Sequence, residues 1–390
     1  MFDFFNYTFT TLSLSLAILV GIIVLFQLLH YIIIYGRIIF RKNKGNNLLS
    51  DEDNPQGVSV VVVVNNNSKE LQNELLKLLE QNHPLFEVVV VNENSSDDTE
   101  YVLTVLKHTY KNIKVINLGQ NANRFSDRKF SVAIGIRSAQ YDTIVLSDII
   151  ADVKDFDWLK SITAPMKTQG KKILIGYVAL EKQKGLLNQF AQYFHATWAM
   201  NSLGYALLGY PFSSDGKNMA YSKEFFFQKG GLIAQYRENC RQEDYFLSHF
   251  ADKKNTVVNL NPKSFVTYPA YSNYHAFKRM AYAQYLSHRA FPFSTKLRLA
   301  VLPISTLLLY LTIAFMIVIG FPWQYLLLPI LIKWVSQIIY YNKCTKIIDA
   351  KILSVFAPLY EFYFIFFNFN LRVKKLFTRK KTRKIRWERK

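Results

Sequence analysis

Two stretches of the sequence decide the fold: Gly57–Asn65, which reads GVSVVVVVN, and Phe86–Val91, which reads FEVVVV. Both are short, nearly continuous runs of β-branched residues, without the alternation typical of a strand that has one face in water. Such runs are typical of strands buried on both faces of a parallel sheet. They therefore predict the first two strands of an α/β domain.

The segments that follow alternate between helix and strand patterns. Leucines at helical spacing in KELQNELLKLLEQ predict a helix that Ser68 caps and that ends at His83-Pro84. This alternation predicts a mostly parallel sheet with helices on both faces. The further predicted elements are helices over 100–110 and 128–139, and strands over 113–118, 143–146 and 172–180.

Polar residues follow directly after three of these strands. In sheets of this class, ligands bind at the carboxyl ends of the strands. The candidates for a site are therefore Asn65–Asn67, Asn92–Ser96 and the residues from Asp148 onward. The sequence has neither a GxGxxG pattern nor a phosphate-binding P-loop, which argues against a dinucleotide-dependent dehydrogenase and a Walker-type ATPase.

Composition excludes several classes of protein. The chain has 390 residues, a formal net charge of +20 and 50% hydrophobic residues, too apolar for a chain that is mainly disordered. Its two cysteines, Cys240 and Cys344, do not form the framework of a secreted disulfide protein. No Cys/His cluster has the spacing of a zinc site.

The N-terminal part predicts a membrane anchor over residues 1–36. Leu12–Tyr35 contains no Lys, Arg, Asp or Glu and is long enough to cross ~30 Å of hydrocarbon. A signal peptide would begin with basic residues, whereas this N-terminus carries Asp3 and no base. Basic residues instead open the polar linker at 37–55, so we expect the N-terminus outside and the following domain in the cytoplasm.

A second apolar region covers residues 296–371. It predicts spans at about 299–320 and 322–341, the second interrupted by Lys333 and Gln337. The stretch 352–371 carries Glu361 and is predicted either to cross the membrane or to lie in the interface, with Glu361 near the headgroups.

The tail at 372–390 has eleven Lys/Arg and one Glu. We expect it to stay cytoplasmic and to bind anionic lipid. Nucleic acid is disfavoured as its partner, because a basic run directly after apolar segments is typical of a membrane flank.

Several motifs now occur together in order over residues 57–290. They are VSVVVVVNNN…LLKLLEQNHPLFEVVVVNENSSDDT, RKFSVAIGIRSAQYDTIVLSD, GYPFSSDGKNMAYSKEFF and QEDYFL. In this order they resemble the family 2 glycosyltransferases, and the apolar ends resemble a membrane-anchored bacterial subgroup. The resemblance implies a GT-A fold with a Rossmann-like, mostly parallel sheet in a cytoplasmic domain at 56–295. It also implies a multi-pass protein of the inner membrane that uses a nucleotide-sugar donor.

The resemblance assigns Asn66, Glu93, Arg128 and Asp148 to the donor. Glu93 falls where the family places an acid against the nucleoside, although Asn92 replaces the acid that more often precedes it. A carboxylate there accepts hydrogen bonds from base or ribose. The alternative for Glu93 is an Asx-type turn that caps the next helix. Arg128 would pair with a phosphate, or is a solvated charge at a helix start.

Asp148 falls at the first acid of the family's D-x-D motif, which holds a divalent cation. Ile150 occupies the place of the second acid and cannot ligate a metal. Mg²⁺ often binds through one or two carboxylates plus phosphate, so Asp148 alone, or with Asp152, could hold Mg²⁺ or Mn²⁺. The alternative is that Asp148 only caps a turn.

The resemblance implies that Asp244 is the catalytic base, with Glu243 beside it. Inverting transfer needs a carboxylate that accepts the proton of the acceptor hydroxyl. Both acids also suit a helix N-terminus without any catalytic role. The family loop at 213–218 places Gly216, Lys217 and Asn218 near the acceptor or a phosphate, since glycine permits close backbone approach.

Processive synthases of this family carry Q-x-x-R-W, and the corresponding region here, His275–Tyr282, lacks it. The sequence thus favours non-processive, inverting transfer of a sugar to a membrane-associated, lipid-linked acceptor. The alternative is an inactive family member that serves as a membrane scaffold in glycan assembly, which the replacements at Asn92 and Ile150 would suit. Leu186–Tyr210 is either an amphipathic element at the lipid or an ordinary core helix.

Overall fold

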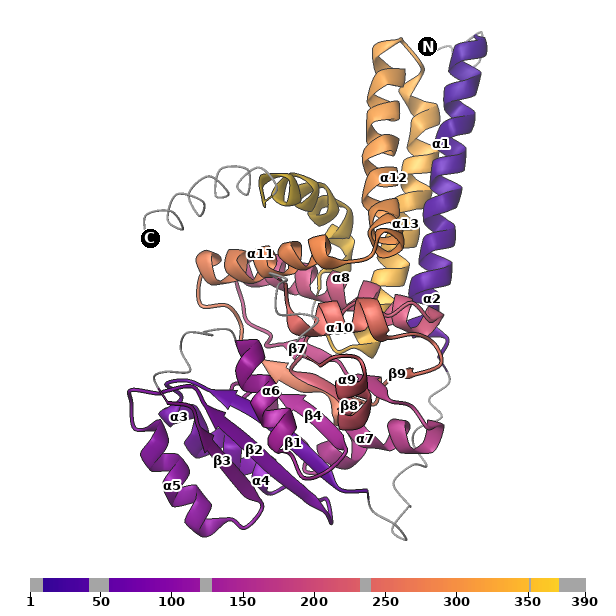
Figure 1. Ribbon diagram of the computed structural model, residues 1–390. Helices are drawn as coiled ribbons and strands as arrows, with labels where there is room; N and C mark the ends of the chain where they lie inside the picture. Colours follow the sequence, from indigo (N-terminus) through magenta and orange to yellow (C-terminus); the bar gives the residue numbers. More distant parts are fainter. Residues whose placement is uncertain (1–9, 42–55, 120–127, 232–239, 351, 372–390) are drawn as a thin grey trace, which may run out of the picture. The chain divides into compact units, whose positions relative to one another are not determined.

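The computed structural model describes residues 10–41, 56–119, 128–231, 240–350 and 352–371. The predicted basic tail at 372–390 and most of the linker at 37–55 lie outside these residues. The chain divides into two units, which are described separately (Figure 1). One comprises residues 40–292 and 346–351, and the other comprises 1–39, 293–345 and 352–390.

The first unit is built on a seven-stranded sheet in the order β3-β2-β1-β4-β8-β6-β9 (Figure 1). Its neighbours pair in parallel except at β8, which runs antiparallel to β4 and β6. The predicted mostly parallel α/β sheet is therefore confirmed. The strands are β1 (Val58–Val64), β2 (Phe86–Asn92), β3 (Ile113–Asn117), β4 (Thr143–Ser147), β6 (Ile173–Ile175), β8 (Asn218–Ser222) and β9 (Thr256–Val258).

Helices cover both faces of β1, which explains its continuous β-branched run. All seven residues of β1 are buried. Val60, Val62 and Val64 belong to one core cluster with leucines of the helical segment 68–79. On the other face, a Cβ at Gly135 would lie 2.5 Å from Val61. The covering helices are α3 (Ser68–Glu70) to α4 (Leu76–Leu79), joined by a π-helical turn (Leu71–Leu75), α5 (Thr99–Thr109), α6 (Arg128–Ser138) and α7 (Trp158–Gln169).

The single strand predicted over 172–180 is wrong. The chain leaves the large sheet after β6 and enters a second sheet, in the order β5-β10-β7. The break falls at Gly176, where a Cβ would lie 2.6 Å from the Asn218 carbonyl oxygen, so the backbones approach too closely for a larger residue. The strands of the second sheet are β5 (Asp152–Val153), β7 (Val178–Leu180) and β10 (Val266–Tyr268).

Helix α8 (Leu186–Leu208) packs as a core helix. Side chains along it bond to backbone carbonyls of the same unit: Gln192 Nε2 to Leu180 at 2.9 Å and His195 Nε2 to Val178 at 2.8 Å. Phe194 meets Phe277 of α11 edge to face. Of the two alternatives for this stretch, the core helix is therefore the one observed. The remaining elements of the unit are α9 (Lys223–Gln228), α10 (Gln242–Phe250), a 3-10 turn (Pro262–Ser264) and α11 (Tyr274–Ala290).

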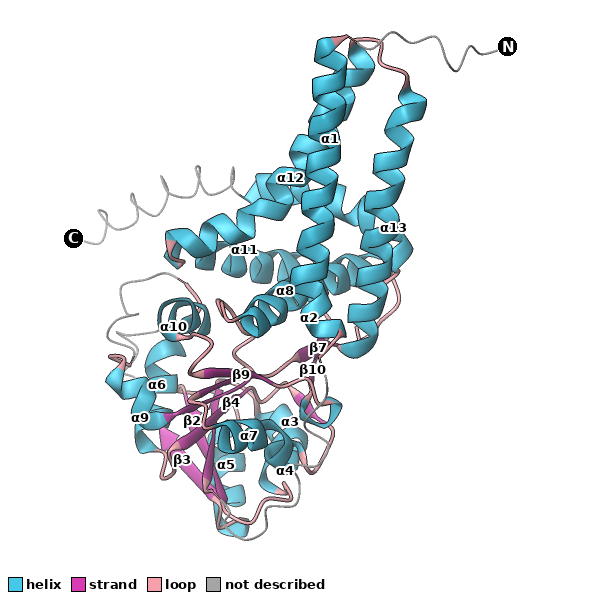
Figure 2. Cartoon of the chain, turned by 90° about the vertical axis from the view of Figure 1, so that its right-hand side faces the viewer, coloured by secondary structure: helices cyan, strands magenta, loops and turns pink. Residues whose placement is uncertain are grey.

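The second unit is a bundle of long helices, which run alongside one another in Figure 2. Within the described residues, two helices are long and apolar enough to cross a bilayer, Thr11–Ile39 and Phe293–Val318. The predicted span at 322–341 is helical but is not among them. The elements are α1 (Thr11–His30), a π-helical turn (Tyr31–Tyr35), α2 (Gly36–Ile39), α12 (Phe293–Val318), α13 (Trp323–Ile347), a 3-10 turn (Ser354–Phe356) and helical residues 357–371.

A polar network lies inside this bundle. Lys333 of α13, whose side chain is fully buried, forms an ion pair with Glu361. Glu361 also accepts a hydrogen bond from Thr306 at 2.9 Å, and Gln27 of α1 donates to Thr306 at 3.4 Å. The helix at 357–371 is thus tied to α12 and α13 through Glu361. Its membrane-crossing or interfacial position stays a prediction.

The outward faces of the same helices are apolar. Large apolar side chains stay exposed along α1, α12 and α13, including Ile22, Leu311 and Leu328 at 59%, 59% and 64%. Polar residues inside and exposed apolar residues outside are typical of a bundle whose surroundings are lipid.

Replacing only Lys333 of the Lys333–Glu361 pair should destabilise the bundle more than replacing both residues by uncharged ones. Lys333→Met leaves a buried carboxylate without its partner, so we expect a cost of about 3–5 kcal/mol in unfolding free energy. The double variant Lys333→Met/Glu361→Gln buries no charge and should recover most of the lost thermal stability. Thermal unfolding in detergent of both single variants and the double variant measures the coupling. Additive losses would show that the pair contributes no coupling.

Candidate active site

The carboxyl ends of β1 and β2 bring Asn66 and Glu93 to one edge of the sheet. Val64 and Asn92 are paired in the register of these strands, and the Glu93 amide donates to the Val64 carbonyl at 2.9 Å. Asn66 has a positive φ of 54° and joins the two loops, because its amide oxygen accepts from the Ser96 backbone at 2.8 Å. The partly exposed Glu93 is thus held at the strand end by its backbone.

Asn92, in the place of the family's more usual acid, is 2% exposed. Its amide nitrogen donates to Asn117 on β3 at 3.2 Å, and its oxygen accepts from the Ser95 hydroxyl at 2.6 Å. A neutral amide can satisfy a donor and an acceptor at once, which a carboxylate cannot. Asn92 therefore stabilises the loop, and Glu93 is the acid that this edge retains.

Asp148 follows β4 and lies against Arg128 at the start of α6. The Arg128 guanidinium donates to Asp148 Oδ2 at 3.0 Å, and the Ile150 amide donates to Oδ1 at 3.3 Å. The sequence prediction brought these two residues to one site, and the structure pairs them directly. The Arg128 side chain is 55% exposed and that of Asp148 is 10% exposed.

These residues do not fit the divalent cation that a D-x-D motif implies. Ile150 packs against the hydrophobic core, and Asp152 binds Lys77 at 2.6 Å. The one remaining carboxylate, Asp148, is already paired with a guanidinium, which repels a second cation. No group of three or more His, Cys, Asp or Glu with metal-binding geometry occurs within the described residues.

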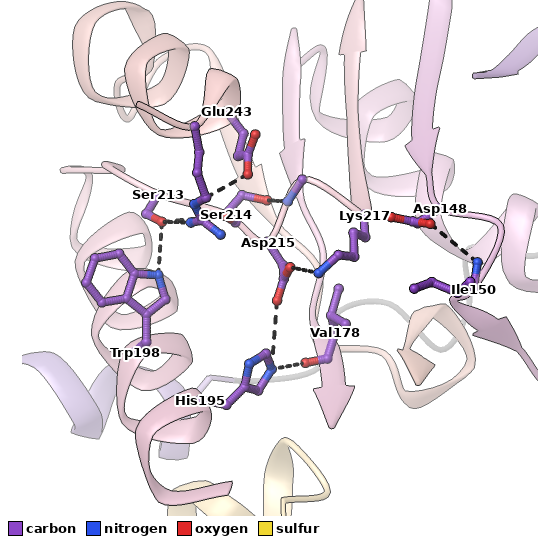
Figure 3. A network of polar contacts seen from close by, with 12 residues as sticks. Asp148, Ile150, Val178, His195, Trp198, Ser213, Ser214, Asp215, Lys217 and Glu243 are labelled. Atoms are coloured by element: carbon purple, nitrogen blue, oxygen red, sulfur yellow. Dashed lines mark hydrogen bonds and ion pairs between the residues drawn. The ribbon is translucent and has the colours of Figure 1, made fainter. Parts of the chain in front are cut away.

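Lys217 and Asp215 form the next part of the site. Lys217 Nζ lies 2.9 Å from Asp215 and 3.7 Å from the ring centroid of Tyr268, and Asp215 lies 3.8 Å from His195 Nε2. Figure 3 shows Lys217 between Asp215 and Asp148. Burial alone would raise the pKa of the Asp215 carboxyl, but Lys217, His195 and Arg241 hold that pKa well below its ordinary value.

Asn218 is a structural residue in this loop. It is 1% exposed, and its amide nitrogen donates to the carbonyls of Tyr177 at 2.7 Å and Ser264 at 2.8 Å. Its oxygen accepts from the indole of Trp158 at 3.2 Å. With its side chain occupied in this way, Asn218 holds the loop in place, and Lys217 is the residue that provides a charge.

Arg241 lies at the centre of the site, directly before α10. It donates to both oxygens of Asp244, from Nε at 2.7 Å and from the NH2 group at 2.8 Å, and to the Ser214 carbonyl at 2.9 Å. Ser213 donates to Asp244 at 2.6 Å. The Asp244 side chain has no exposed surface, so the acid that the resemblance assigns as base has both oxygens occupied.

Glu243 is the neighbouring carboxylate that keeps some exposure. Its side chain is 16% exposed and lies 3.5 Å from Arg241 Nε. Burial, with Asp244 nearby, outweighs Arg241 and raises the pKa of Glu243 to about 7. A carboxyl group with a pKa near neutral pH is suited to proton transfer.

The structure thus forms two groups from the predicted residues. Asn66, Glu93, Arg128 and Asp148 lie at the carboxyl ends of β1, β2 and β4, and Gly216, Glu243 and Asp244 lie around Arg241. Lys217, paired with Asp215 and next to Asp148, lies between the two groups. The prediction missed Arg241, Asp215, His195 and Tyr268. Arg241 is the N-cap of α10 and Asp244 is the third residue of the helix. This spacing was a usable signal, because side chains at the N-cap and at the third helical position meet.

Of two cavities in this unit, only the smaller one borders the charged residues of the site. One of about 30 Å³ is bordered by His195 and Asp215. A larger one, of about 300 Å³, is lined by Lys77, Gln81 and residues 152–156, and Asp152, which pairs with Lys77, is the one residue considered for the site that lines it. We therefore define the site by its charged residues rather than by the larger cavity.

Gly216 gives a direct test of the packing against Glu243. It has a φ of +72°, and a Cβ there would lie 2.6 Å from the Glu243 carboxyl carbon. Gly216→Ala should lose about 1–2 kcal/mol from the left-handed backbone and about 1–3 kcal/mol more from overpacking.

Gly170→Ala is the matched control, because its φ of +59° is similar and nothing lies within 4 Å of its Cβ. Thermal unfolding compares the two variants. Equal losses of stability would contradict the close contact between Gly216 and Glu243.

The chain is similar to known proteins in its fold and in its sequence profile. No curated protein matches. Among solved structures, the mannosyltransferase PcManGT from Pyrobaculum calidifontis, in complex with GDP-Man and Mn²⁺, aligns over 88% of this chain and 96% of its own, with a TM-score of 0.54 and 15% identity. S. aureus TarS 1–349 in complex with UDP covers 60% of this chain and 65% of its own, with a TM-score of 0.41 and 16% identity.

The likeness to PcManGT confirms the predicted GT-A fold class. The sequence profile of glycosyl transferase family 21 matches residues 16–388. The matching designation is thus family 21, and the likeness to family 2 stays a resemblance. Because the match spans nearly the whole sequence, this chain belongs to glycosyl transferase family 21 and is a glycosyltransferase.

Proposed function

We propose that the chain transfers a sugar from a nucleotide-sugar donor to a lipid-linked acceptor at a membrane, with inversion and one sugar at a time. The observation that carries this proposal is the position of Glu243, a carboxylate that keeps some exposure and lies 3.5 Å from Arg241 of the buried Arg241–Asp244 pair. Burial there raises the pKa of Glu243. The related fold of PcManGT, which was solved with GDP-Man, supports a nucleotide-sugar donor.

The donor would bind along the carboxyl edge of the sheet. Glu93 and Asn66 lie there at the ends of β2 and β1, suited to the hydrogen-bond donors of a nucleoside. Asp148 follows β4, which is the other neighbour of β1, and forms an ion pair with Arg128. In this proposal the nucleoside lies at β1 and β2, and the diphosphate lies towards β4 and β8.

Glu243 would accept the proton in the transfer step. The acceptor hydroxyl oxygen attacks the anomeric carbon, and its proton passes to the Glu243 carboxylate. The bond between that carbon and the diphosphate oxygen breaks, and the nucleoside diphosphate leaves with the electron pair. Because the new bond forms on the face opposite the leaving group, this single displacement inverts the anomeric centre.

Asp244 would act as a positioning residue. Its two oxygens bind Arg241 and Ser213, so it fixes the guanidinium that faces Glu243. Its negative charge also contributes to the raised pKa of Glu243. Asp244 thus acts on the acceptor proton through Glu243 and not by direct contact.

The membrane location is supported by the helical bundle, which is polar inside and apolar outside. The basic residues after α1 support an inner-membrane protein with its catalytic unit on the cytoplasmic side, where nucleotide sugars are made. The predicted anionic-lipid partner of the tail at 372–390 stays a prediction, because that tail lies outside the described residues.

The variants Glu243→Gln and Asp244→Asn separate base from positioning residue. We expect Glu243→Gln to lower kcat about 10²- to 10⁴-fold, because the amide cannot accept the proton. The wild-type rate should rise with pH through about 7, as Glu243 loses its proton. In Asp244→Asn the midpoint should move to lower pH, because one cause of the raised pKa is removed and Arg241 is freed to pair with Glu243.

Stability against pH provides the control for folding. A carboxyl group whose pKa is higher in the folded than in the unfolded state favours folding at low pH, and stability falls as pH rises between the two values. Glu243→Gln removes this loss, so its melting temperature at pH 8 should be no lower than that of the wild type. A fully active Glu243→Gln beside an inactive Asp244→Asn would make Asp244 the base.

The transfer itself is tested with detergent-purified full chain. UDP-, GDP- and dTDP-sugars are offered with and without membrane lipid extract, and release of nucleoside diphosphate is measured. Release that requires lipid supports a lipid-linked acceptor. The absence of release from every donor, together with no thermal stabilisation by any nucleotide, would overturn the proposal in favour of a scaffold.

A further inference from the structure

The residues at the position of the D-x-D pattern, Asp148 and Ile150, differ from the pair of acids that would hold a divalent cation against the donor. The second acid of the D-x-D pattern is Ile150, whose side chain packs against the core. Asp148 retains one carboxylate, which accepts from the Arg128 guanidinium at 3.0 Å and from the Ile150 amide at 3.3 Å. A carboxylate already neutralised by a guanidinium has little charge left for a metal ion.

A second cation lies beside Asp148. In the antiparallel pairing of β4 and β8, Ser147 is opposite Asn218. Extended by one residue, this register places Asp148 opposite Lys217. Figure 3 shows the two side by side. Asp148 thus lies between Arg128, which comes from α6, and Lys217, which comes from the loop before β8.

Lys217 keeps its positive charge despite its burial. Burial alone would lower the pKa of the ammonium group, but Asp215, Tyr268 and Asp148 together raise it above its ordinary value. Asp215, 2.9 Å away, and the ring of Tyr268, 3.7 Å from the ammonium, hold the side chain in place. A lysine side chain held in this way can bind an anion with little further loss of conformational entropy.

Arg128 and Lys217 thus place two side-chain cations here, with Asp148 and Asp215 as their counter-charges. An arginine presents paired N–H groups to phosphate oxygens, and a lysine acts as a point charge. Both lie by the carboxyl end of β4, the edge at which ligands bind in such sheets. The anion that fits them is the diphosphate of a nucleotide donor.

We propose that Arg128 and Lys217, oriented by Asp148, bind the donor diphosphate in place of a divalent cation. The inference rests on the proposed function and states which side chains of that site offset the negative charge of the donor diphosphate. Transfer by this chain should accordingly proceed without added metal.

The test is calorimetric titration of the detergent-purified full chain with UDP, GDP and dTDP, in EDTA and in Mn²⁺. We expect one nucleotide to bind with affinities that agree within about twofold in the two conditions. Binding that requires Mn²⁺ would overturn the inference and leave the proposed function standing. Binding of no nucleotide in either condition would overturn the proposed function as well.

Substitutions identify the cations. Arg128→Gln and Lys217→Gln should each weaken binding in EDTA about tenfold, the worth of one charge-assisted hydrogen bond. Lys217→Arg, which keeps the charge, should bind more tightly than Lys217→Gln. Arg137→Gln, an exposed site at the other end of α6, is the control and should bind like the wild type. Wild-type affinity in both Arg128→Gln and Lys217→Gln would overturn the inference.

Ile150→Asp tests the same idea by gain of function. It supplies the second carboxylate, so Mn²⁺ should tighten nucleotide binding by about tenfold in this variant. Ile150→Val, the control, should respond to Mn²⁺ no more than the wild type. An equal response to Mn²⁺ in all three proteins would contradict the inference.

Discussion

The site depends on the buried ion pair between Arg241 and Asp244. The Arg241 guanidinium donates to both carboxylate oxygens of Asp244 and to the Ser214 carbonyl. Ser213 donates a further hydrogen bond to Asp244. Leaving either charge without its partner in such a place costs about 3–5 kcal/mol. The pair therefore fixes the start of α10 against the loop before β8. This contact in turn sets the position of Glu243 against Gly216. Burial at this position, together with the negative charge of Asp244, raises the pKa of Glu243.

Much of the fold was predictable because its strongest signals are local. The runs at 57–65 and 86–91 are long, apolar and β-branched, and they became β1 and β2. The short strands β5, β7 and β10 were not predictable, since two or three residues carry no recognisable period. Gly176 divides one apolar run between two sheets because of a contact with Asn218, which lies 42 residues further along the chain.

The sequence was sufficient to predict which residues form the site, but less sufficient to predict what each of them does there. Residues that follow strands were identified because strand ends share an edge. Whether an acid is free or occupied depends on distant partners. Asp244 is occupied by Arg241 and Ser213, and Asn218 by three groups from separate segments. The same limit applies in the helical unit, where Lys333 interrupts an apolar stretch but finds Glu361 inside the bundle.

The bonds of Asn218 have a mechanical consequence. This one side chain joins the large sheet at β8 to the chain that enters β7 and to the turn before β10. These bonds connect the two sheets next to Lys217 and oppose a hinge motion between them. They also hold together the segments that carry Lys217 and Tyr268, whose ammonium group and ring centroid lie 3.7 Å apart. Lys217 therefore stands on a support that both sheets share.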